Sequence, residues 1–532
     1  MVQRTGPGRA GVDPALAWSN RLRVEVGGPG TVAHAGVVLP RLLADRLGLT
    51  QGLAGVVARA GFTPMRHRGR LLVDTACALA SGATALTDVE ALTRQEEIYG
   101  PGGAASDTTV LRGLDELADR LGGNGLPGRR LSRAMARARA KAWAAIVGRH
   151  AGLPAVRVAG ADLRRPGQDG QPGRPVVVVR MDATVIHAAS DKDGAEPNFK
   201  GYGFHPLTAW CSNVGDNLAA MGRPGSAGSF TAADHVAVLD AAIAQLPPAW
   251  RDDLLVTVDG AGASHDLVDH LTKLNTARRA DRSYGQRGRR VEYSVGWPVD
   301  ARTKAAIDAL SESDWTTALR ADGNPDLHIA GPDGGDGQDG DGQDKAQVVD
   351  LTGLLRHSTA DGQAKVDRLD GWPADLRVIA RRTPREPNEQ AELGQDAHWR
   401  YGAFATNTAT GGPGTQVQWL DARHRTQAHV EDNIKDTKAC GAARLPSKDY
   451  ERNNAWLQLT TLAVSLLAWL RLIALDGDLA KAEPKALRFR LLSAPARLAT
   501  HARKKILKIP PGWAWSTDLA TAWHRIHALH PA

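Results

Sequence analysis

Four consecutive valines, at positions 176–179, constrain the fold of this chain more than any other feature. They belong to the stretch RPVVVVRMDA, in which polar residues do not alternate with the apolar ones. Such a run predicts a strand buried on both faces of its sheet, as in parallel sheets that helices cover on two sides. A second apolar run, LLVTVDG (254–260), follows the helical pattern of 231–247. This alternation of strands and helices predicts an α/β fold.

Both apolar strands end in an aspartate, Asp182 in the first and Asp259 in the second. A carboxylate taken out of water is costly unless it is compensated, and two carboxylates on neighbouring strands also repel each other. A divalent cation such as Mg²⁺, which prefers carboxylate oxygens, relieves both costs. The pair therefore predicts a metal site of the kind that cleaves phosphodiesters with two ions. Taken singly, each aspartate is equally a turn residue.

The helix predicted over TQAHVEDNIKDTK (426–438) offers a third carboxylate, Glu431. Lys435 lies four residues further on, hence on the same helix face, and Lys438 lies near the end of the segment. Lysines beside a metal-ligating glutamate suit the phosphates of a nucleic acid. Glu431 alone is typical of an exposed helix surface, so only the combination of the three acids is specific.

The charge of the chain favours a polyanionic partner. Lys and Arg number 66 against 58 for Asp and Glu, a net charge of +8. Within the helix predicted over 128–143, cations recur every four residues without an interleaved acid, at Arg129, Arg133, Arg137 and Lys141. Like charges at this spacing repel, so the stripe predicts contact with an anion such as DNA, with a solvated basic face as the alternative.

Three short helices precede this stripe, over 69–82, 84–94 and 106–123. They are compatible with a helix-turn-helix in which 106–121 contacts DNA bases, and equally with a plain helical bundle. The three cysteines, Cys77, Cys211 and Cys440, lack CxxC spacing, which argues against a disulfide framework and a structural zinc site. No signal peptide is expected from the N-terminal residues, and the apolar stretch 456–475 predicts a buried helix rather than a membrane span.

Several motifs together carry a resemblance to a known family. They are MDAT (181–184), KGYGFHPL (200–207), VTVDG (256–260) and the block that starts at HVEDNIKDTK and ends at 457. From about residue 37 to residue 510 the chain resembles the DDE transposases of bacterial insertion sequences, in particular the IS thirteen-eighty group. The resemblance implies an RNase H-like catalytic core with a β-rich insertion between the second Asp and the Glu. It also implies that Asp182, Asp259 and Glu431 are the catalytic residues and the ligands of two Mg²⁺ ions, with Mn²⁺ as a substitute.

The same resemblance implies a division of the chain. Its segments are a helical N-terminal DNA-binding region (1–162), the first part of the core (174–284), the β-rich insertion (285–410), the second part of the core (411–478) and a basic C-terminal tail (479–532). Within the insertion, the acidic and glycine-rich segment 321–345 predicts a disordered loop. Further strands are expected over 376–384, 398–407 and 417–425.

The implied function is that of an insertion-sequence transposase in the bacterial cytoplasm, associated with the nucleoid. Such an enzyme binds the terminal inverted repeats of its element and performs metal-dependent DNA cleavage and strand transfer into target DNA. It is expected to act as a homodimer on DNA and not to associate with a membrane. The expected DNA contacts are Lys438, Lys435, Arg425, Trp297, Arg129, Arg133, Arg137 and Lys141. Trp297 is the candidate for stacking on a flipped base, with a core tryptophan as the alternative, and His205 is expected near the metal ions.

The residues that precede the glutamate differ from those of related transposases. They carry Tyr-x2-Arg-x3-Glu-x6-Lys, whereas this chain has His424 and Gln427 at the positions of Tyr and Arg. Two alternative functions remain open: an RNase H-like nuclease without strand transfer, and a catalytically silent DNA-binding regulator derived from a transposase. A glycosidase with paired carboxylates fits less well, because only 5% of the residues are aromatic and the basic stripe is left unexplained.

Overall fold

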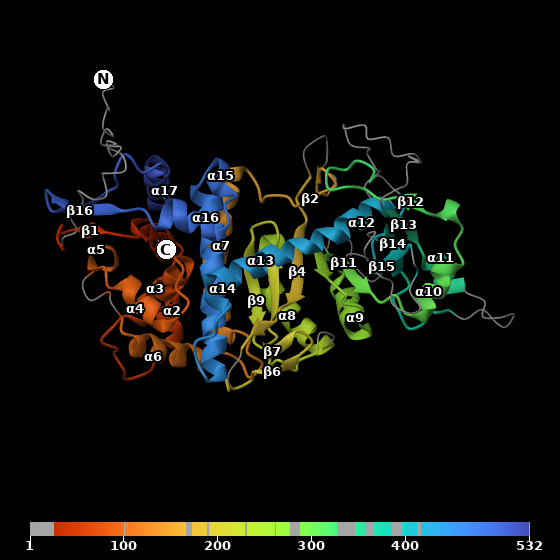
Figure 1. The fold of residues 1–532 in the computed structure, drawn as a ribbon, viewed down its shortest axis with the longest axis horizontal. Helices are drawn as coiled ribbons and strands as arrows, with labels where there is room; N and C mark the ends of the chain where they lie inside the picture. The colour runs from red at the N-terminus through yellow and green to blue at the C-terminus, as the bar shows by residue number, and fades with distance from the viewer. Residues whose placement is uncertain are drawn as a thin grey trace, which may run out of the picture.

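The fold is known from a computed structural model. It describes residues 26–100, 103, 105–165, 173–188, 191–228, 231–260, 262–276, 288–326, 346–357, 367–385, 396, 398–411 and 416–530. Most of the predicted acidic loop, residues 327–345, lies outside the described residues. Figure 1 shows a group of helices at one end of the molecule and a large twisted sheet that continues to the other end.

Nine strands form the large sheet, in the order β12-β13-β14-β15-β11-β10-β4-β8-β9. Their bounds are β4 (Val177–Ala183), β8 (Leu207–Cys211), β9 (Asp216–Met221), β10 (Asp253–Val258), β11 (Arg290–Trp297), β12 (Thr316–Thr317), β13 (Gln347–Asp350), β14 (Arg377–Pro384) and β15 (Trp399–Thr406). β10 is parallel to both β4 and β11, and the other neighbours are antiparallel. The α/β prediction is confirmed, and the strands of 285–410 continue the same sheet.

The valine run of β4 is buried on both faces, as its sequence predicts. Val177 and Val179 belong to the main core, which includes α8 (Ala232–Gln245) and α14 (Tyr450–Ala474). Val178 packs instead with Leu255 and Ala422 in a separate cluster on the other face. Because side chains alternate along a strand, every second residue of β4 faces the helix that carries Ala422.

That helix is α12 (Val417–Arg425), and it corrects the expectation of a strand over 417–425. Val417 and Leu420, three residues apart, pack together against Ile379 and Phe404 of the sheet, a spacing that places them on one face of a helix. Valine and tryptophan suggest a strand from sequence, but burial on one helical face decides the structure. A 3₁₀ turn (Thr426–Ala428) joins α12 to α13 (His429–Thr437), which crosses the sheet in Figure 1.

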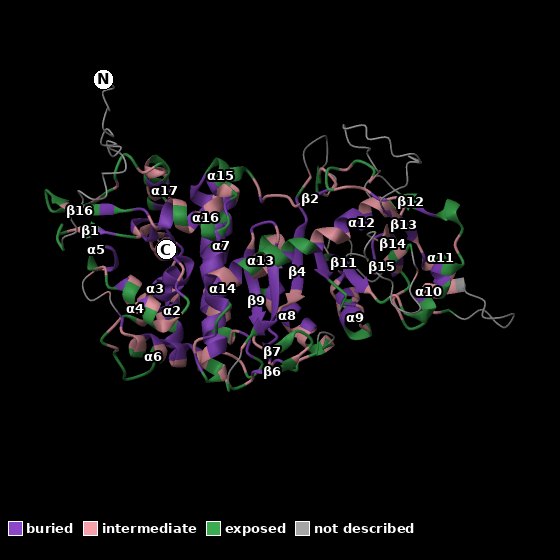
Figure 2. Ribbon diagram, in the orientation of Figure 1, coloured by how far each residue is buried: buried purple, intermediate pink, exposed green. Residues whose placement is uncertain are grey.

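The helical end of the molecule is built around α14. Its other helices are α1 (Val38–Arg46), α2 (Leu49–Val57), α3 (Arg68–Ala80), α4 (Leu86–Thr93), α5 (Glu96–Tyr99), α6 (Asp107–Ala118) and α7 (Arg129–His150). α14 contacts α1, α3, α6 and α7 as well as β9, so it joins the helices to the sheet. By length and composition α14 is the one helix in the described part of the chain that could cross a membrane, but 83% of its most apolar window is buried inside the molecule. Figure 2 shows this burial along its length.

The two ends of the described chain meet in a small sheet. β1 (Thr31–Val32) pairs with β16 (Ala496–His501), which pairs with β17 (Lys504–Lys508). The C-terminal segment also contains α15 (Gly477–Ala480), α16 (Pro484–Leu487) and α17 (Ser516–His527), and α17 contacts α1 and α14. The predicted basic tail is therefore folded against the N-terminal region.

The remaining elements are short. A third sheet has the order β5-β7-β6, from β5 (Ile186–His187), β6 (Glu196–Asn198) and β7 (Gly201–Phe204). It follows β4 directly in the chain, next to Asp182. The others are β2 (Arg157–Val158), β3 (Ala161–Asp162), α9 (His265–Leu274), α10 (Ala301–Asp308) and α11 (Thr352–His357).

A buried ion pair fastens α7 and α14 to the sheet. Arg139 of α7 donates from Nε to Oδ2 of Asp216 on β9 at 2.9 Å, and neither side chain is exposed to solvent. The same oxygen accepts hydrogen bonds from the indole N–H groups of Trp143 (3.3 Å) and Trp469 (2.9 Å). Arg139 thus faces the core, unlike the exposed cations Arg133 and Arg137 of the same helix.

Replacing Asp216 with Ala is expected to lower the free energy of unfolding by roughly 3–5 kcal/mol, because the buried charge of Arg139 then loses its carboxylate and keeps only neutral hydrogen-bond acceptors. Urea unfolding monitored by tryptophan fluorescence measures this change. The matched control is Arg137→Ala on the exposed face of the same helix, which is expected to shift stability by no more than about 0.5 kcal/mol. Equal stability of the two variants would contradict this account of the ion pair.

Candidate active site

The register of the sheet brings Asp182 and Asp259 together. β4 and β10 are parallel neighbours in which Met181 pairs with Val258, so the two aspartates occupy the next positions on each strand. Neighbouring strands lie roughly 5 Å apart. Asp182 lies four residues after Val178, and Asp259 lies four residues after Leu255. Because side chains alternate between the two faces of a sheet, both aspartates point to the face that α12 and α13 cover.

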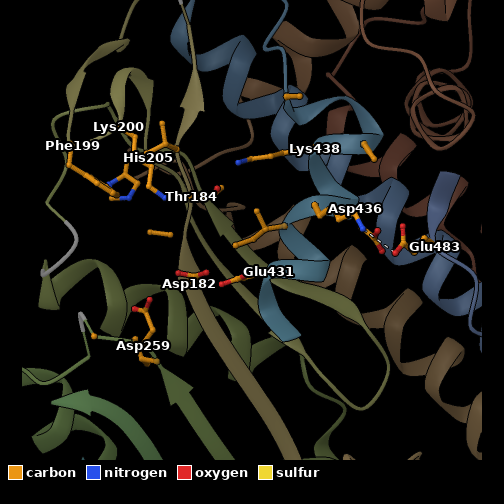
Figure 3. A pocket seen from close by; sticks show the side chains of 18 of the residues that line it. Asp182, Thr184, Phe199, Lys200, His205, Asp259, Glu431, Asp436, Lys438 and Glu483 are labelled. Atoms are coloured by element: carbon orange, nitrogen blue, oxygen red, sulfur yellow. Dashed lines mark hydrogen bonds and ion pairs between the residues drawn. The ribbon is translucent and has the colours of Figure 1, made fainter. Parts of the chain in front are cut away.

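Glu431 reaches the same place from α13. Four residues before it, the buried side chain of Gln427 fastens this segment to both strands. Its Nε2 donates to the carbonyl oxygen of Met181 at 2.9 Å, and its Oε1 accepts a hydrogen bond from the Thr257 hydroxyl. Figure 3 shows the carboxyl groups of Asp182 and Glu431 turned toward each other, with Asp259 on the neighbouring strand.

These three acids line one open cavity of about 940 Å³. Its walls come from the end of β4, the loop after β10, the turn between β6 and β7, and α13 with the residues that follow it. The other charged or titratable lining residues are Lys200, His205, His235, Lys435, Asp436, Lys438, Glu483 and Lys485. Segments that lie far apart in the sequence therefore meet at the carboxyl ends of β4 and β10, two inner strands of the large sheet.

Both acids and lysines line this cavity. Burial and, after it, the nearby charges of Asp259 and Glu431 together raise the pKa of Asp182 to about 7, whereas Lys200 lowers it. Among the described residues, no ion pair joins Asp182 or Glu431 to a cation. The fold thus places Asp182 and Glu431 in one cavity without an ion-pair partner among the described residues.

A metal ion is the kind of partner that this donor set fits. Hard divalent cations prefer carboxylate oxygens, and the repulsion between Asp182 and its neighbours is what such a cation relieves. Within the described ranges, however, no three His, Cys, Asp or Glu side chains are arranged so that they could hold an ion as they stand. Binding therefore requires the three side chains to adjust toward a common point.

The two lysines predicted on α13 have different surroundings. Lys438 lines the cavity, burial lowers its pKa, and it makes no hydrogen bond or ion pair with the described residues. Lys435 also lines the cavity, but its Nζ forms an ion pair with Glu483 at 3.1 Å. Lys200, from the turn between β6 and β7, faces the carboxylates as well, and Figure 3 shows it on the wall opposite Lys438.

His205 lies at the cavity, as the sequence predicts, and is almost fully buried. Its Nδ1 is 2.8 Å from the carbonyl oxygen of Ala227, so the ring is held in place from behind. Trp297 does not line the cavity: its indole N–H donates to Thr303 at 3.2 Å, and its ring lies 4.9 Å from that of Trp372. This tryptophan is packed against protein rather than presented to the cavity.

The residues before Glu431 do not reach the cavity. Arg425 donates from Nε to Asp421 at 3.0 Å. His424 is stacked on Phe404 with ring centres 4.3 Å apart, and burial lowers its pKa to about 3, so the ring is neutral. Gln427 holds the two strands. His424 and Gln427, the two residues that differ from the signature of related transposases, therefore both contact protein rather than the cavity.

The basic stripe lies on the surface of α7, and its four members, Arg129, Arg133, Arg137 and Lys141, are all exposed. None of them lines the carboxylate cavity or forms an ion pair within the described part of the chain. The helices predicted as a DNA reader are less basic: Arg112 is the exposed cation of α6, beside the acids Asp107 and Asp115.

Sequence reasoning overlooked two residues of the site. Gln427 is noticed in the sequence only as a departure from the related signature, and its role in holding the strands appears only when the strands beside it are known. Phe199 lines the cavity from the turn between β6 and β7 and is strongly exposed. The one signal for it was its position directly before the glycine-rich motif KGYGF (200–204), which indicates a tight hairpin.

Comparison with known proteins gives a family match over almost the whole chain. The family described as "Transposase DDE domain group 1" matches residues 16–531. No curated protein matches the chain. Among solved structures, one similar chain is that of a piggyBac transposase synaptic complex with hairpin DNA, determined by cryo-EM. The identity is 8% and the TM-score 0.34, with 95% of this chain and 88% of the other covered.

The raised pKa of Asp182 predicts how stability depends on pH. The pKa is about 7 in the folded protein and 3.8 ordinarily, so the folded state binds the extra proton between these values. Stability therefore falls as pH rises from about 4 to about 7, and Asp182→Asn removes up to about 4 kcal/mol of this penalty. Thermal unfolding of both proteins is expected to show a stabilising effect of the substitution that is larger near pH 8 than near pH 5.

Added Mg²⁺ provides the complementary measurement. At the higher pH it is expected to raise the unfolding temperature of the wild type, because a cation binds the folded state. The rise is expected to be smaller in Asp182→Asn, which lacks one ligand. If Asp182→Asn raised the unfolding temperature by the same amount at both pH values, the pKa of the Asp182 carboxyl would be its ordinary one, which would contradict the first of these two predictions.

Proposed function

The chain belongs to the family of transposases with a group 1 DDE domain, and from this premise we propose that it is an insertion-sequence transposase. In this proposal it binds the terminal inverted repeats of its element, cuts there, and joins the freed ends to target DNA. One observation carries it: Asp182, Asp259 and Glu431, from three separate segments of the chain, line a single cavity.

Members of this family use divalent metal ions. We propose that Asp182, Asp259 and Glu431 would hold two Mg²⁺ ions here, with Mn²⁺ as a substitute. When bound, the ions neutralise the carboxylates and stabilise the negative charge that develops on the reacting phosphate. Lys438 supports the proposal, because a lysine at the cavity wall that has no hydrogen bond or ion pair with the described residues suits a phosphate oxygen.

Both chemical steps are displacements at phosphorus. In cleavage, the oxygen of water bonds to the phosphorus at the element's end, and the 3′ oxygen leaves and takes up a proton. In joining, the oxygen of that 3′-hydroxyl bonds to a phosphorus of the target and gives up its proton, and the target's own 3′ oxygen leaves and takes up a proton. Neither step needs a covalent bond to the protein, so the residues of the cavity only bind, orient and neutralise.

The finer architecture is part of the proposal. The five strands β9-β8-β4-β10-β11 would form an RNase H-like core with α8 and α9, and β12–β15 would be the insertion before Glu431. The order of these strands, with one carboxylate at the end of β4 and another after β10, supports this division. Membership in the IS thirteen-eighty group rests on the sequence motifs, and a homodimer on DNA follows from the need to join two ends.

Glu431→Gln and Asp182→Asn are expected to reduce DNA cleavage at least about 100-fold, as loss of a single electrostatic group does in other active sites. Binding of the end DNA should persist. The test incubates purified protein, Mg²⁺ and a duplex with the DNA that borders the gene, and separates cleaved and joined products by gel. Asp432→Asn, an exposed neighbour outside the cavity, is the matched control and should cut like the wild type.

The products also separate the alternative functions. Cleavage without joined products would identify a nuclease, and binding without cleavage by the wild type would identify a silent regulator. A Glu431→Gln variant that cuts as fast as Asp432→Asn would remove Glu431 from the proposed site.

The exposed stripe of α7 is expected to contact DNA phosphates. Replacing Arg133 and Arg137 with Ala should weaken DNA binding to a similar degree for any sequence, and should reduce the slope of log K against log salt by about one for each lost contact. Fluorescence anisotropy at several salt concentrations measures the slope. Lys304→Ala, a half-buried cation of α10 that pairs with Asp308, serves as control, and an unchanged slope in the double variant would exclude the stripe from the interface.

A further inference from the structure

The turn between β6 and β7 presents an aromatic ring at the mouth of the carboxylate cavity. Phe199 is 70% exposed, yet it lines the same cavity as Asp182 and Glu431. Figure 3 shows Phe199, Lys200 and His205 together on one wall. An exposed ring at this place offers a flat apolar surface to a ligand bound at the cavity.

The ring is held in a fixed position. His205 meets it edge to face, with ring centres 5.8 Å apart and planes at 69°, and His205 is itself buried and fixed to Ala227. Asn198 accepts a hydrogen bond from the backbone N–H of Lys200 at 2.9 Å, which closes the turn. At Gly203 an added Cβ would lie 2.0 Å from the carbonyl oxygen of Ile186, so only glycine permits this hairpin. The platform is therefore formed before any ligand binds.

A cation stands directly beside this ring. The Nζ of Lys200 lies 5.3 Å from the centre of the Phe199 ring, and Lys200 lines the cavity too. A planar apolar surface and a positive charge at this separation match the two parts of a nucleotide, its base and its phosphate. Base stacking on an aromatic side chain tolerates any base, because every base has a π-face.

Other exposed or nearby aromatic residues do not offer this combination. Phe489 is 65% exposed, but it contacts Trp513 and Trp515 and does not line the cavity. Trp297, the candidate from the sequence, is covered by Trp372. In the described part of the chain, Phe199 is thus the exposed aromatic ring that faces the three acids.

We propose that Phe199 is a stacking platform for an unpaired base of the nucleotide next to the scissile phosphate, and that Lys200 contacts a phosphate of the same strand. The proposal rests on the proposed function and adds to it the way in which the DNA end is held. Taking a base out of the duplex costs stacking and pairing energy, and stacking of the base on Phe199 offsets part of this cost. The distorted end can then bring its phosphate to the carboxylates.

The test uses a duplex with the DNA that borders the gene, after the wild type has defined the position of cleavage on it. Phe199→Ala is expected to cut this duplex about tenfold more slowly, the loss that removal of one stacking contact produces. Phe199→Trp should restore the rate. Phe489→Ala, an equally exposed phenylalanine outside the cavity, should cut like the wild type.

Two further measurements report on stacking itself. With 2-aminopurine at the nucleotide next to the cleaved bond, in the Asp182→Asn background, the intact platform should quench its fluorescence and Phe199→Ala should not. With an abasic nucleotide at that position, the wild type and Phe199→Ala should cut at the same rate, because there is no base to stack.

The outcomes separate the two proposals. A wild type that cuts, with Phe199→Ala indistinguishable from Phe489→Ala in rate and quenching, overturns the platform and leaves the transposase proposal standing. Slow cutting by Phe199→Ala that persists on the abasic duplex also overturns it. A wild type that neither binds nor cuts the end DNA overturns the proposed function and the platform with it.

Discussion

The hydrogen bonds of Gln427 hold together the three elements that carry the acids. Its amide bridges the carbonyl of Met181 on β4 and the hydroxyl of Thr257 on β10, one residue before Asp182 and two before Asp259. Glu431 follows one helical turn later on the same segment. Because an amide both donates and accepts, this one side chain fixes the helix relative to two strands at once. The position of every carboxylate in the cavity depends on this connection.

The arrangement that Gln427 fixes is electrostatically unfavourable in the protein alone. Three acids share a cavity, and burial together with their mutual repulsion holds the pKa of Asp182 near 7. The rest of the fold offsets this cost, since α14 is buried along most of its length and the pair of Arg139 and Asp216 joins the helices to the sheet. The folded framework thus maintains a group of acids whose mutual repulsion a bound cation relieves.

How far the sequence predicts this structure depends on whether a pattern is local. The valine run, the aspartates that end two strands and the Ser106 cap of α6 follow from neighbouring residues, and the structure contains them. The segment 417–425 was misassigned because its β-forming residues pack at helical spacing against the sheet. The pairing of β1 with β16 could not be predicted, since no local pattern specifies a partner at the opposite end of the chain.

The same distinction between local patterns and tertiary contacts explains why Phe199, and not Trp297, is the stacking candidate. Both follow or precede a strand in the sequence, and only the tertiary fold decides which ring is covered. Trp297 contacts Trp372 and donates a hydrogen bond to Thr303 of α10, whereas the Phe199 hairpin is anchored through His205 and its ring is 70% exposed. Residue type therefore nominates a stacking group, and exposure at the cavity selects it. The same criterion distinguishes Lys438, whose ammonium group faces the cavity, from Lys435, whose charge is already paired with Glu483.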